Sequence, residues 1–152
     1  MVERVINLDD IYNYFGGRDR VAVKFNPEKT WWLSISKAKI AEGIKGFPVP
    51  KAGWKKGEDG KYYYDLGWYE VPWYDCDDYA FAAVGWLRRK FPDHAIWIAV
   101  VFYPKKMVYH ATVAFWNSDD EKVWIFEPMN RSFHEAGYSP YYGEEEVIYL
   151  IG

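Results

Sequence analysis

From residue 75 onward, the pattern of apolar and polar residues is regular and predicts one helix followed by four strands. Between Cys76 and Phe91, apolar residues recur at the spacing of one helix face, and Pro92 stops the run. Asp75 is the expected N-cap of this helix. The next four segments are rich in β-branched and aromatic residues and predict an antiparallel sheet. They are AIWIAVVFY at 95–103, MVYHATVAFW at 107–116, KVWIFEP at 122–128 and EVIYLI at 146–151.

The first half of the chain has weaker periodicity. LDDIYNYF predicts a short helix capped by Asp9 or Asp10, and RVAVKF predicts a short strand. From Thr30, near-helical spacing of apolar residues predicts a second helix. The stretch that follows mixes turn residues with aromatic ones and predicts a long structured loop with a small hairpin at Gly60. We therefore expect one α+β domain over residues 1–152, with helices in 1–45, an aromatic loop at 46–74 and the core at 75–152.

Charge and composition exclude several classes of function. The net charge is −3 and the basic clusters are short and scattered, so we expect no nucleic-acid partner. No apolar run approaches the roughly 20 residues that span a bilayer, and the amino terminus lacks the layout of a signal peptide. CxxC, HExxH and EF-hand patterns are absent, so we expect neither a metal nor another cofactor. These observations predict a soluble, cytoplasmic protein without a membrane partner and leave its oligomeric state open.

The sequence contains no glutamine, whereas lysine, arginine and glutamate are plentiful. Depletion of thermolabile residues together with abundant ionic residues is typical of heat-adapted proteins. We therefore expect a thermophilic protein; a composition biased by chance is the competing explanation.

Cys76 is the only cysteine, and it lies in WYDCDDYAFA between two aspartates. It cannot form an internal disulfide. A helix N-terminus lowers the pKa of a thiol, because unpaired backbone N–H groups point at it. The neighbouring carboxylates oppose the thiolate, so a reactive Cys76 requires a cation close by. The alternative is an ordinary buried cysteine.

His110 is the best candidate for that cation. A turn at NSDD, residues 117–120, places His110 directly opposite Glu127 on the next strand. In this register His110 and Glu127 point into a cleft, whereas Ala111 and Phe126 point away from it. Directly opposed residues have Cβ atoms about 4.5 to 5.5 Å apart, so Glu127 can accept a hydrogen bond from one ring nitrogen and leave the other for the thiol. This is the arrangement of nucleophile, base and orienting carboxylate found in catalytic triads.

Three segments together resemble the core of the transglutaminase-like branch of papain-fold cysteine enzymes, especially bacterial transglutaminase-like cysteine proteinases. They are DCDDYA at a helix start, HATVAFW on a strand and WIFEP on the next, within roughly residues 73–130. The resemblance implies a papain-like fold, with Cys76 as nucleophile, His110 as general base and acid, and Glu127 as the orienting carboxylate. In that family the last position is usually aspartate, so the glutamate here is one methylene longer.

The resemblance also implies an oxyanion hole made by the backbone N–H of Cys76 and a second donor. Because the chain has no glutamine, Trp73 and Tyr74 are the candidates for that donor. Aromatic residues make up 21% of the chain, more than a small core requires, so we expect some of them to line a groove. The aromatic loop would form a wall of the cleft, with substrate-binding candidates Trp54, Tyr62, Tyr64 and Trp68.

Two classes of function follow. The first is a cysteine hydrolase or acyl transferase that acts on an amide bond of a peptide or protein through a thioester at Cys76. The second is a non-catalytic transglutaminase-like binding module that uses an aromatic-lined groove for a glycan, peptide or protein partner. A thiol and imidazole within about 4 Å favour the enzyme, whereas a sealed Cys76 favours the module.

His94 and His134 are expected to be exposed in loops. The acidic run at 143–147 is expected to guard the edge of the last strand.

Overall fold

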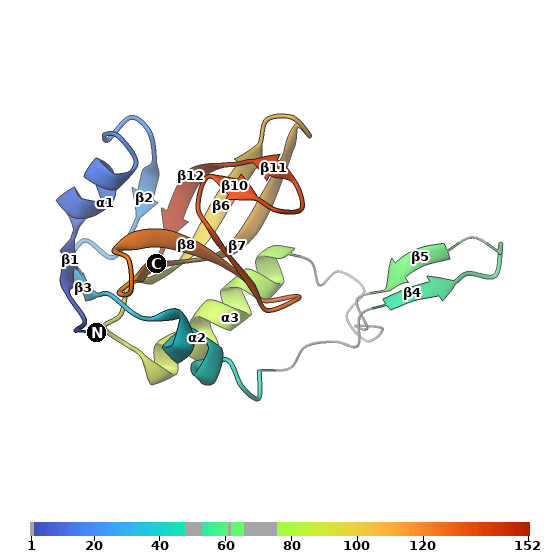
Figure 1. Ribbon diagram of the computed structural model, residues 1–152, viewed down its shortest axis with the longest axis horizontal. Coiled ribbons are helices and arrows are strands. Elements are labelled where there is room, and N and C mark those ends of the chain that lie inside the picture. Colours follow the sequence, from blue (N-terminus) through green and yellow to red (C-terminus); the bar gives the residue numbers. More distant parts are fainter. Residues whose placement is uncertain (1, 48–52, 61, 66–75) are drawn as a thin grey trace.

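A central sheet dominates the computed structural model, which describes residues 2–47, 53–60, 62–65 and 76–152. In spatial order, the strands of this sheet are β2 (Ala22–Lys24), β12 (Glu146–Ile151), β6 (Ile96–Tyr103), β7 (Val108–Asn117), β8 (Lys122–Glu127) and β9 (Ser132–Glu135) (Figure 1). Neighbouring strands pair antiparallel except β2 and β12, which pair parallel. The expected α+β class and the antiparallel arrangement of the four C-terminal strands are therefore confirmed.

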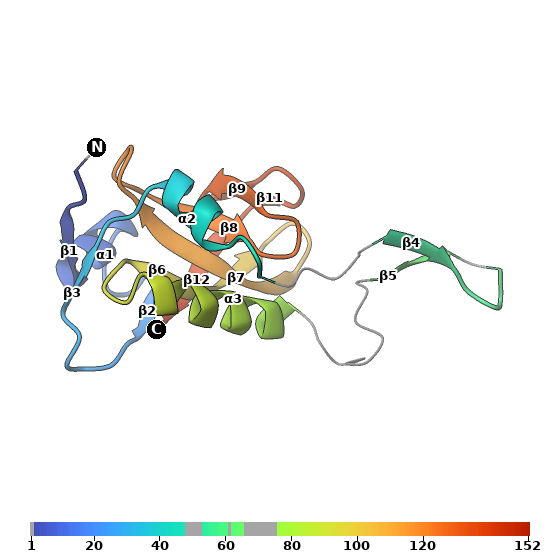
Figure 2. The ribbon, with the colours of Figure 1, turned by 90° about the horizontal axis from the view of Figure 1, so that it is seen from below.

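The core consists of two clusters, one on each face of the sheet. Side chains of β6 alternate between them, with Ile96 and Ile98 on one face and Trp97 and Ala99 on the other. The first cluster includes residues of α2 (Lys37–Gly43) and α3 (Cys76–Lys90), and Figure 2 shows α3 lying along this face. The second cluster includes residues of α1 (Leu8–Tyr14) and of the antiparallel pair β1 (Val5–Asn7) and β3 (Trp31–Leu33).

Helix α3 forms as its apolar stripe predicts, beginning at Cys76 and ending at Lys90. The expected N-cap, Asp75, lies outside the described residues. At the other end, Arg88 donates a hydrogen bond to the carbonyl of Ile96 at 2.9 Å. The carboxyl end of the helix is therefore tied to the start of β6, and α3 packs along β6 and β7. The buried residues of the stripe are Tyr79, Ala80, Ala83, Val84 and Leu87.

The amino-terminal part differs from the expected helices. Asn7 caps α1 in place of Asp9 or Asp10: its side chain accepts from the N–H of Asp10, whose carboxylate accepts from the N–H of Asn7. Asp10 is thus the return partner of a capping box.

The helix expected from Thr30 is wrong in its first half. Residues 31–33 form β3, which pairs with β1, and α2 begins only after Ser36, whose hydroxyl accepts from the N–H of Lys39 at 3.1 Å. Trp32 is buried in the core from this strand. Pairing with a distant strand outweighed a weak helical periodicity. Residues 1–45 therefore contain strands as well as helices, instead of the helices that the sequence predicted.

The hairpin expected at Gly60 is confirmed. Strands β4 (Gly53–Lys56) and β5 (Tyr62–Asp65) pair antiparallel, and Gly60 has a φ of 77°, which favours glycine. Residues 48–52, 61 and 66–75 lie outside the described part. A second small hairpin, β10 (Tyr138–Ser139) with β11 (Gly143–Glu144), was not expected. No helix among the described residues is long and apolar enough to cross a membrane.

Candidate active site

Cys76 is the first residue of α3 and is partly exposed. It packs at the border of the cluster on the α3 face of the sheet, which includes Ala80, Ala111 and Phe126. The first backbone N–H groups of a helix have no partner within the helix and carry partial positive charge. The thiol therefore lies at the positive end of a helix dipole without being sealed in the core.

The expected register between β7 and β8 is wrong by two residues. Val113 pairs with Phe126, which places Thr112, not His110, in line with Glu127. Side chains alternate with a period of two, so a displacement of two residues leaves every side chain on its expected face. His110 and Glu127 therefore still share a face, although they are not directly opposed.

Ala111 and Phe126 point to the opposite face, where they pack in the cluster under α3. Both residues therefore face α3, the helix that carries Cys76, although the sequence predicted that they point away from the cleft. The ladder between β7 and β8 ends at the pair Val113–Phe126. His110 lies beyond that pair, where the two strands are no longer bonded to each other, and there its side chain meets Cys76.

The imidazole of His110 is held by both oxygens of the Glu127 carboxylate. The Nε2 atom of His110 is 2.9 Å from Oε2 and 3.1 Å from Oε1 of Glu127. The side chains are only 16% and 10% exposed, so water competes weakly for this contact. The extra methylene of glutamate is thus accommodated without loss of the hydrogen bond.

Cys76 and His110 are joined by a side-chain hydrogen bond. Because Nε2 faces Glu127, the other ring nitrogen, Nδ1, is the one available to the thiol. Burial opposes the charged imidazole, but the hydrogen bonds and negative charges of Cys76 and Glu127 outweigh it and raise the pKa of His110 to about 10. The ring is therefore an imidazolium at neutral pH, and it supplies the cation that a thiolate at Cys76 requires.

Two residues that the sequence did not indicate position Glu127. The hydroxyl of Thr112 donates to the carbonyl of Phe126 at 2.9 Å, which ties β7 to β8 next to the carboxylate. The N–H of Arg131 donates to the carbonyl of Glu127 at 2.7 Å, and its guanidinium donates to the carbonyl of Phe47 at 2.6 Å. Thr112 lies within the segment HATVAFW, but no pattern in the sequence assigns it this contact, and Arg131 reaches Glu127 through the turn that follows β8.

The other candidate residues are not placed by the structure. The oxyanion candidates Trp73 and Tyr74, and Trp68, lie outside the described residues. Trp54 lies in β4, and Tyr62 and Tyr64 lie in β5, where the structure describes the backbone course. Their roles in substrate binding stay predictions.

A second histidine–carboxylate pair corrects two expectations. His134 is not exposed in a loop but buried on β9, with its Nε2 2.8 Å from Oε1 of Glu145. Glu145, part of the acidic run expected at the surface, is buried as well, and β12 lies between β2 and β6 instead of at an edge. His94 is also largely buried, with its Nε2 2.9 Å from Glu3.

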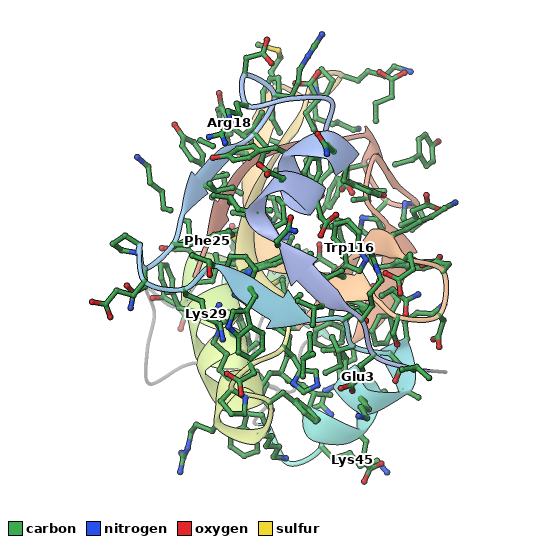
Figure 3. All side chains as sticks on the ribbon, turned by 90° about the vertical axis from the view of Figure 1, so that its left-hand side faces the viewer. Glu3, Arg18, Phe25, Lys29, Lys45 and Trp116 are labelled. Atoms are coloured by element: carbon green, nitrogen blue, oxygen red, sulfur yellow. The ribbon has the colours of Figure 1, made fainter. Side chains whose placement is uncertain are left out.

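A cavity of about 780 Å³ lies away from Cys76, between the segment after α1 and strand β12. Its walls include the aromatic side chains of Tyr14, Phe15 and Tyr149, and charged Arg18 and Arg20 stand beside them. Figure 3 shows α1 and the segment carrying Arg18 on this side of the molecule. No residue of the Cys76–His110–Glu127 cluster lines this cavity.

Within the described ranges, no three histidine, cysteine, aspartate or glutamate side chains group in a way that would hold a metal ion. The side chains brought together at the candidate site carry a thiol, an imidazole and a carboxylate. A scan of the chain against models of known protein families finds no match, and a search of curated proteins finds no similar sequence.

Proposed function

We propose that this protein is a cysteine hydrolase or acyl transferase with a papain-like, transglutaminase-like core, acting on an amide bond of a peptide or protein. One observation carries the proposal: the same imidazole of His110 contacts the Cys76 thiol and both oxygens of Glu127. The order of the three residues along the chain and their placement on a helix start and two adjacent strands support it. A partly exposed Cys76 is also open to a substrate.

In the proposed reaction, the Cys76 thiolate attacks the carbonyl carbon of the amide bond. The C–N bond breaks, and His110 gives its proton to the leaving nitrogen, which leaves an acyl thioester on Cys76. Water or an amine then attacks the thioester, His110 accepts a proton from it, and the thiolate leaves. Glu127 keeps the ring oriented and stabilises its positive charge throughout.

The backbone N–H of Cys76, at the start of α3, is the proposed first donor to the oxyanion that forms during each attack. The second donor is proposed to come from Trp73 or Tyr74, since the chain contains no glutamine.

Alkylation of Cys76 by iodoacetamide tests the proposal. A thiol of ordinary pKa, about 8.5, is less than about 1% thiolate at pH 6, whereas a thiolate paired with imidazolium is mostly ionised there. We expect fast alkylation of the folded protein at pH 6, slowed about 100-fold in His110→Ala. Mass spectrometry of the modified protein gives the rate.

His94→Ala is the matched control, because His94 is a largely buried histidine bonded to a carboxylate, and it follows the carboxyl end of α3 whereas Cys76 begins that helix. It should alkylate like the wild type. Equal rates and equal pH dependence in wild type and His110→Ala would overturn the proposal.

A binding module without turnover is the second candidate, and the cavity beside Tyr14, Phe15 and Tyr149 favours it. This cavity has the aromatic walls that suit a glycan or an apolar side chain. A module predicts a Cys76 that either reacts only when the protein unfolds or follows the pH curve of a free thiol whatever stands at position 110. The alkylation experiment therefore separates the two functions.

A further inference from the structure

Exposed tyrosines gather at the end of the sheet that carries His110. Tyr141 and Tyr142, in the turn between β10 and β11, are 60% and 46% exposed, although large aromatic side chains are usually more buried. The ring of Tyr142 lies 4.9 Å from that of Tyr103 and 6.4 Å from the imidazole of His110, measured between centroids. Tyr142 is thus a partly exposed aromatic wall next to the histidine.

The turn that carries Tyr142 is fixed in place. The N–H groups of Tyr141 and Tyr142 both donate to the hydroxyl of Ser139 at 3.2 Å. Beneath Tyr142, Tyr103 is almost fully buried at the end of β6, and its hydroxyl lies beside the Glu145 carboxylate. A turn whose backbone is held in this way loses little entropy when a ligand packs against it.

The buried pair His134–Glu145 anchors this support. Glu145 accepts from His134 at 2.8 Å and from the N–H of Gly137 at 3.2 Å, while its own N–H donates to the carbonyl of Gly137 at 3.0 Å. These bonds connect β9, the residue before β10 and the residue between β11 and β12. The His134–Glu145 pair therefore supports Tyr103 and the turn that carries Tyr142, and it does not contact the reacting atoms.

The position of Tyr142 next to His110 determines which part of a substrate its ring would contact. In the proposed reaction, His110 hands its proton to the leaving nitrogen and takes one from the attacking nucleophile. A group that flanks the imidazole therefore lies next to the substituent of that nitrogen, not next to the acyl group.

We propose that Tyr142 forms the binding site for an aromatic or large aliphatic side chain on the amine side of the reacting bond. This side chain belongs to the leaving group in the first step and to the incoming amine in the second. The inference rests on the proposed function, since it needs an acyl group on Cys76. It makes amines with an apolar side chain, such as peptide amino termini beginning with an aromatic residue, the preferred acceptors over water.

Competition between two amines for an acetylated Cys76 tests this inference. p-Nitrophenyl acetate transfers its acetyl group to the thiolate, the leaving oxygen takes the proton of His110, and the p-nitrophenol so formed ionises in neutral buffer to p-nitrophenolate. Phenylalaninamide or glycinamide then attacks the thioester: a C–N bond forms, the C–S bond breaks, and the proton of the amine passes to His110. The two amines differ by one benzyl group, and mass spectrometry measures the N-acetyl products.

In the wild type we expect phenylalaninamide to be acetylated about tenfold faster than glycinamide at equal concentration, the size of effect that one aromatic contact provides. Tyr142→Ala should bring the ratio to about one, and Tyr142→Phe should keep it, because the ring makes the contact. Tyr138→Ala is the control: Tyr138 is 65% exposed on β10, and the variant should keep the wild-type ratio.

The outcomes separate this inference from the proposed function. Absence of a p-nitrophenolate burst and of acetylated Cys76 in the wild type overturns the proposed function, and the inference with it. Normal acetylation with a wild-type ratio near one, or with the same ratio in Tyr142→Ala, overturns the inference alone. The far-UV circular dichroism spectrum of Tyr142→Ala should match that of the wild type, which shows that a changed ratio does not come from unfolding.

Discussion

Two histidine–glutamate pairs lie at the same end of the sheet, and they differ in what surrounds them. In each, Nε2 of the imidazole meets a carboxylate oxygen, at 2.9 Å for His110–Glu127 and 2.8 Å for His134–Glu145. The first pair is 16% and 10% exposed, and its imidazole also contacts the Cys76 thiol. The second is 7% and 0% exposed, and its Nδ1 has no partner among the described residues.

The contrast shows that a histidine bonded to a carboxylate is not by itself a catalytic site. Cysteine chemistry requires a thiol beside the imidazole, and of these two pairs the His110 pair is the one that has it. A sealed pair has a different consequence, because removing one partner strands the other in a medium that cannot solvate it. We therefore expect the first pair to control reactivity and the second to control stability.

Loss of His134 should produce the largest effect. His134→Ala leaves the buried Glu145 carboxylate without its main partner, and such losses lower the free energy of unfolding by about 3 to 5 kcal/mol. Near pH 10, where the contribution of the His110 proton is largely lost, His110→Ala should lower it by only about 1 kcal/mol. Urea denaturation of both variants measures the difference, and equal losses would contradict the division between the two pairs.

The titration of His110 should show the next largest effect. In the wild type, NMR of the ring should show an imidazolium that loses its proton near pH 10. Cys76→Ala removes an adjacent negative charge and a hydrogen bond, so the pKa of His110 should fall by roughly 1 to 3 units. A ring that titrates near 6.5 in both proteins would contradict the ion pair.

The raised pKa of His110 also has a consequence for stability. Its folded pKa lies above the ordinary value of about 6.5, so the folded state holds this proton more tightly than the unfolded state does. The stabilising contribution of His110 is fully present below about pH 6.5 and is lost as the pH rises through about 10. The difference in unfolding free energy between wild type and His110→Ala should accordingly shrink between these pH values.

Exchanging each carboxylate for its amide sharpens the comparison at a smaller scale. Glu127→Gln removes the charge that stabilises the imidazolium, so alkylation of Cys76 at pH 6 should slow by about tenfold, less than in His110→Ala. Glu145→Gln should leave the rate within about twofold, because the second pair does not touch the thiol. Equal slowing in both variants would mean that the two pairs act as one network.

Heating tests the smallest expected difference. Because the chain lacks glutamine and is rich in ionic residues, we expect a thermal midpoint above the range of about 45 to 65 °C typical of mesophile domains. Calorimetry at neutral pH gives the midpoint, and a value inside that range would contradict heat adaptation.

Several elements were predictable from the sequence because their determinants are local. Helix α3 followed from its apolar stripe, its charged ends and Pro92, and β6, β7, β8 and β12 followed from runs of β-branched and aromatic residues. For the site, the turn at residues 117–120 predicted a register that is wrong by an even number of residues, so the period of two along a strand still placed His110 and Glu127 on one face. Cys76 was singled out because it begins a helix.

What the sequence by itself determined, then, was which segments are helix or strand in the C-terminal half and which side chains share a face. The tertiary structure alone decided the two-residue register shift, the pairing of β3 with β1 where a helix was expected, and the burial of His134 and Glu145. It also decided that Tyr142 lies beside His110, although 32 residues separate them. Local periodicity cannot encode these features, because each depends on contacts between segments that meet only when the chain has folded.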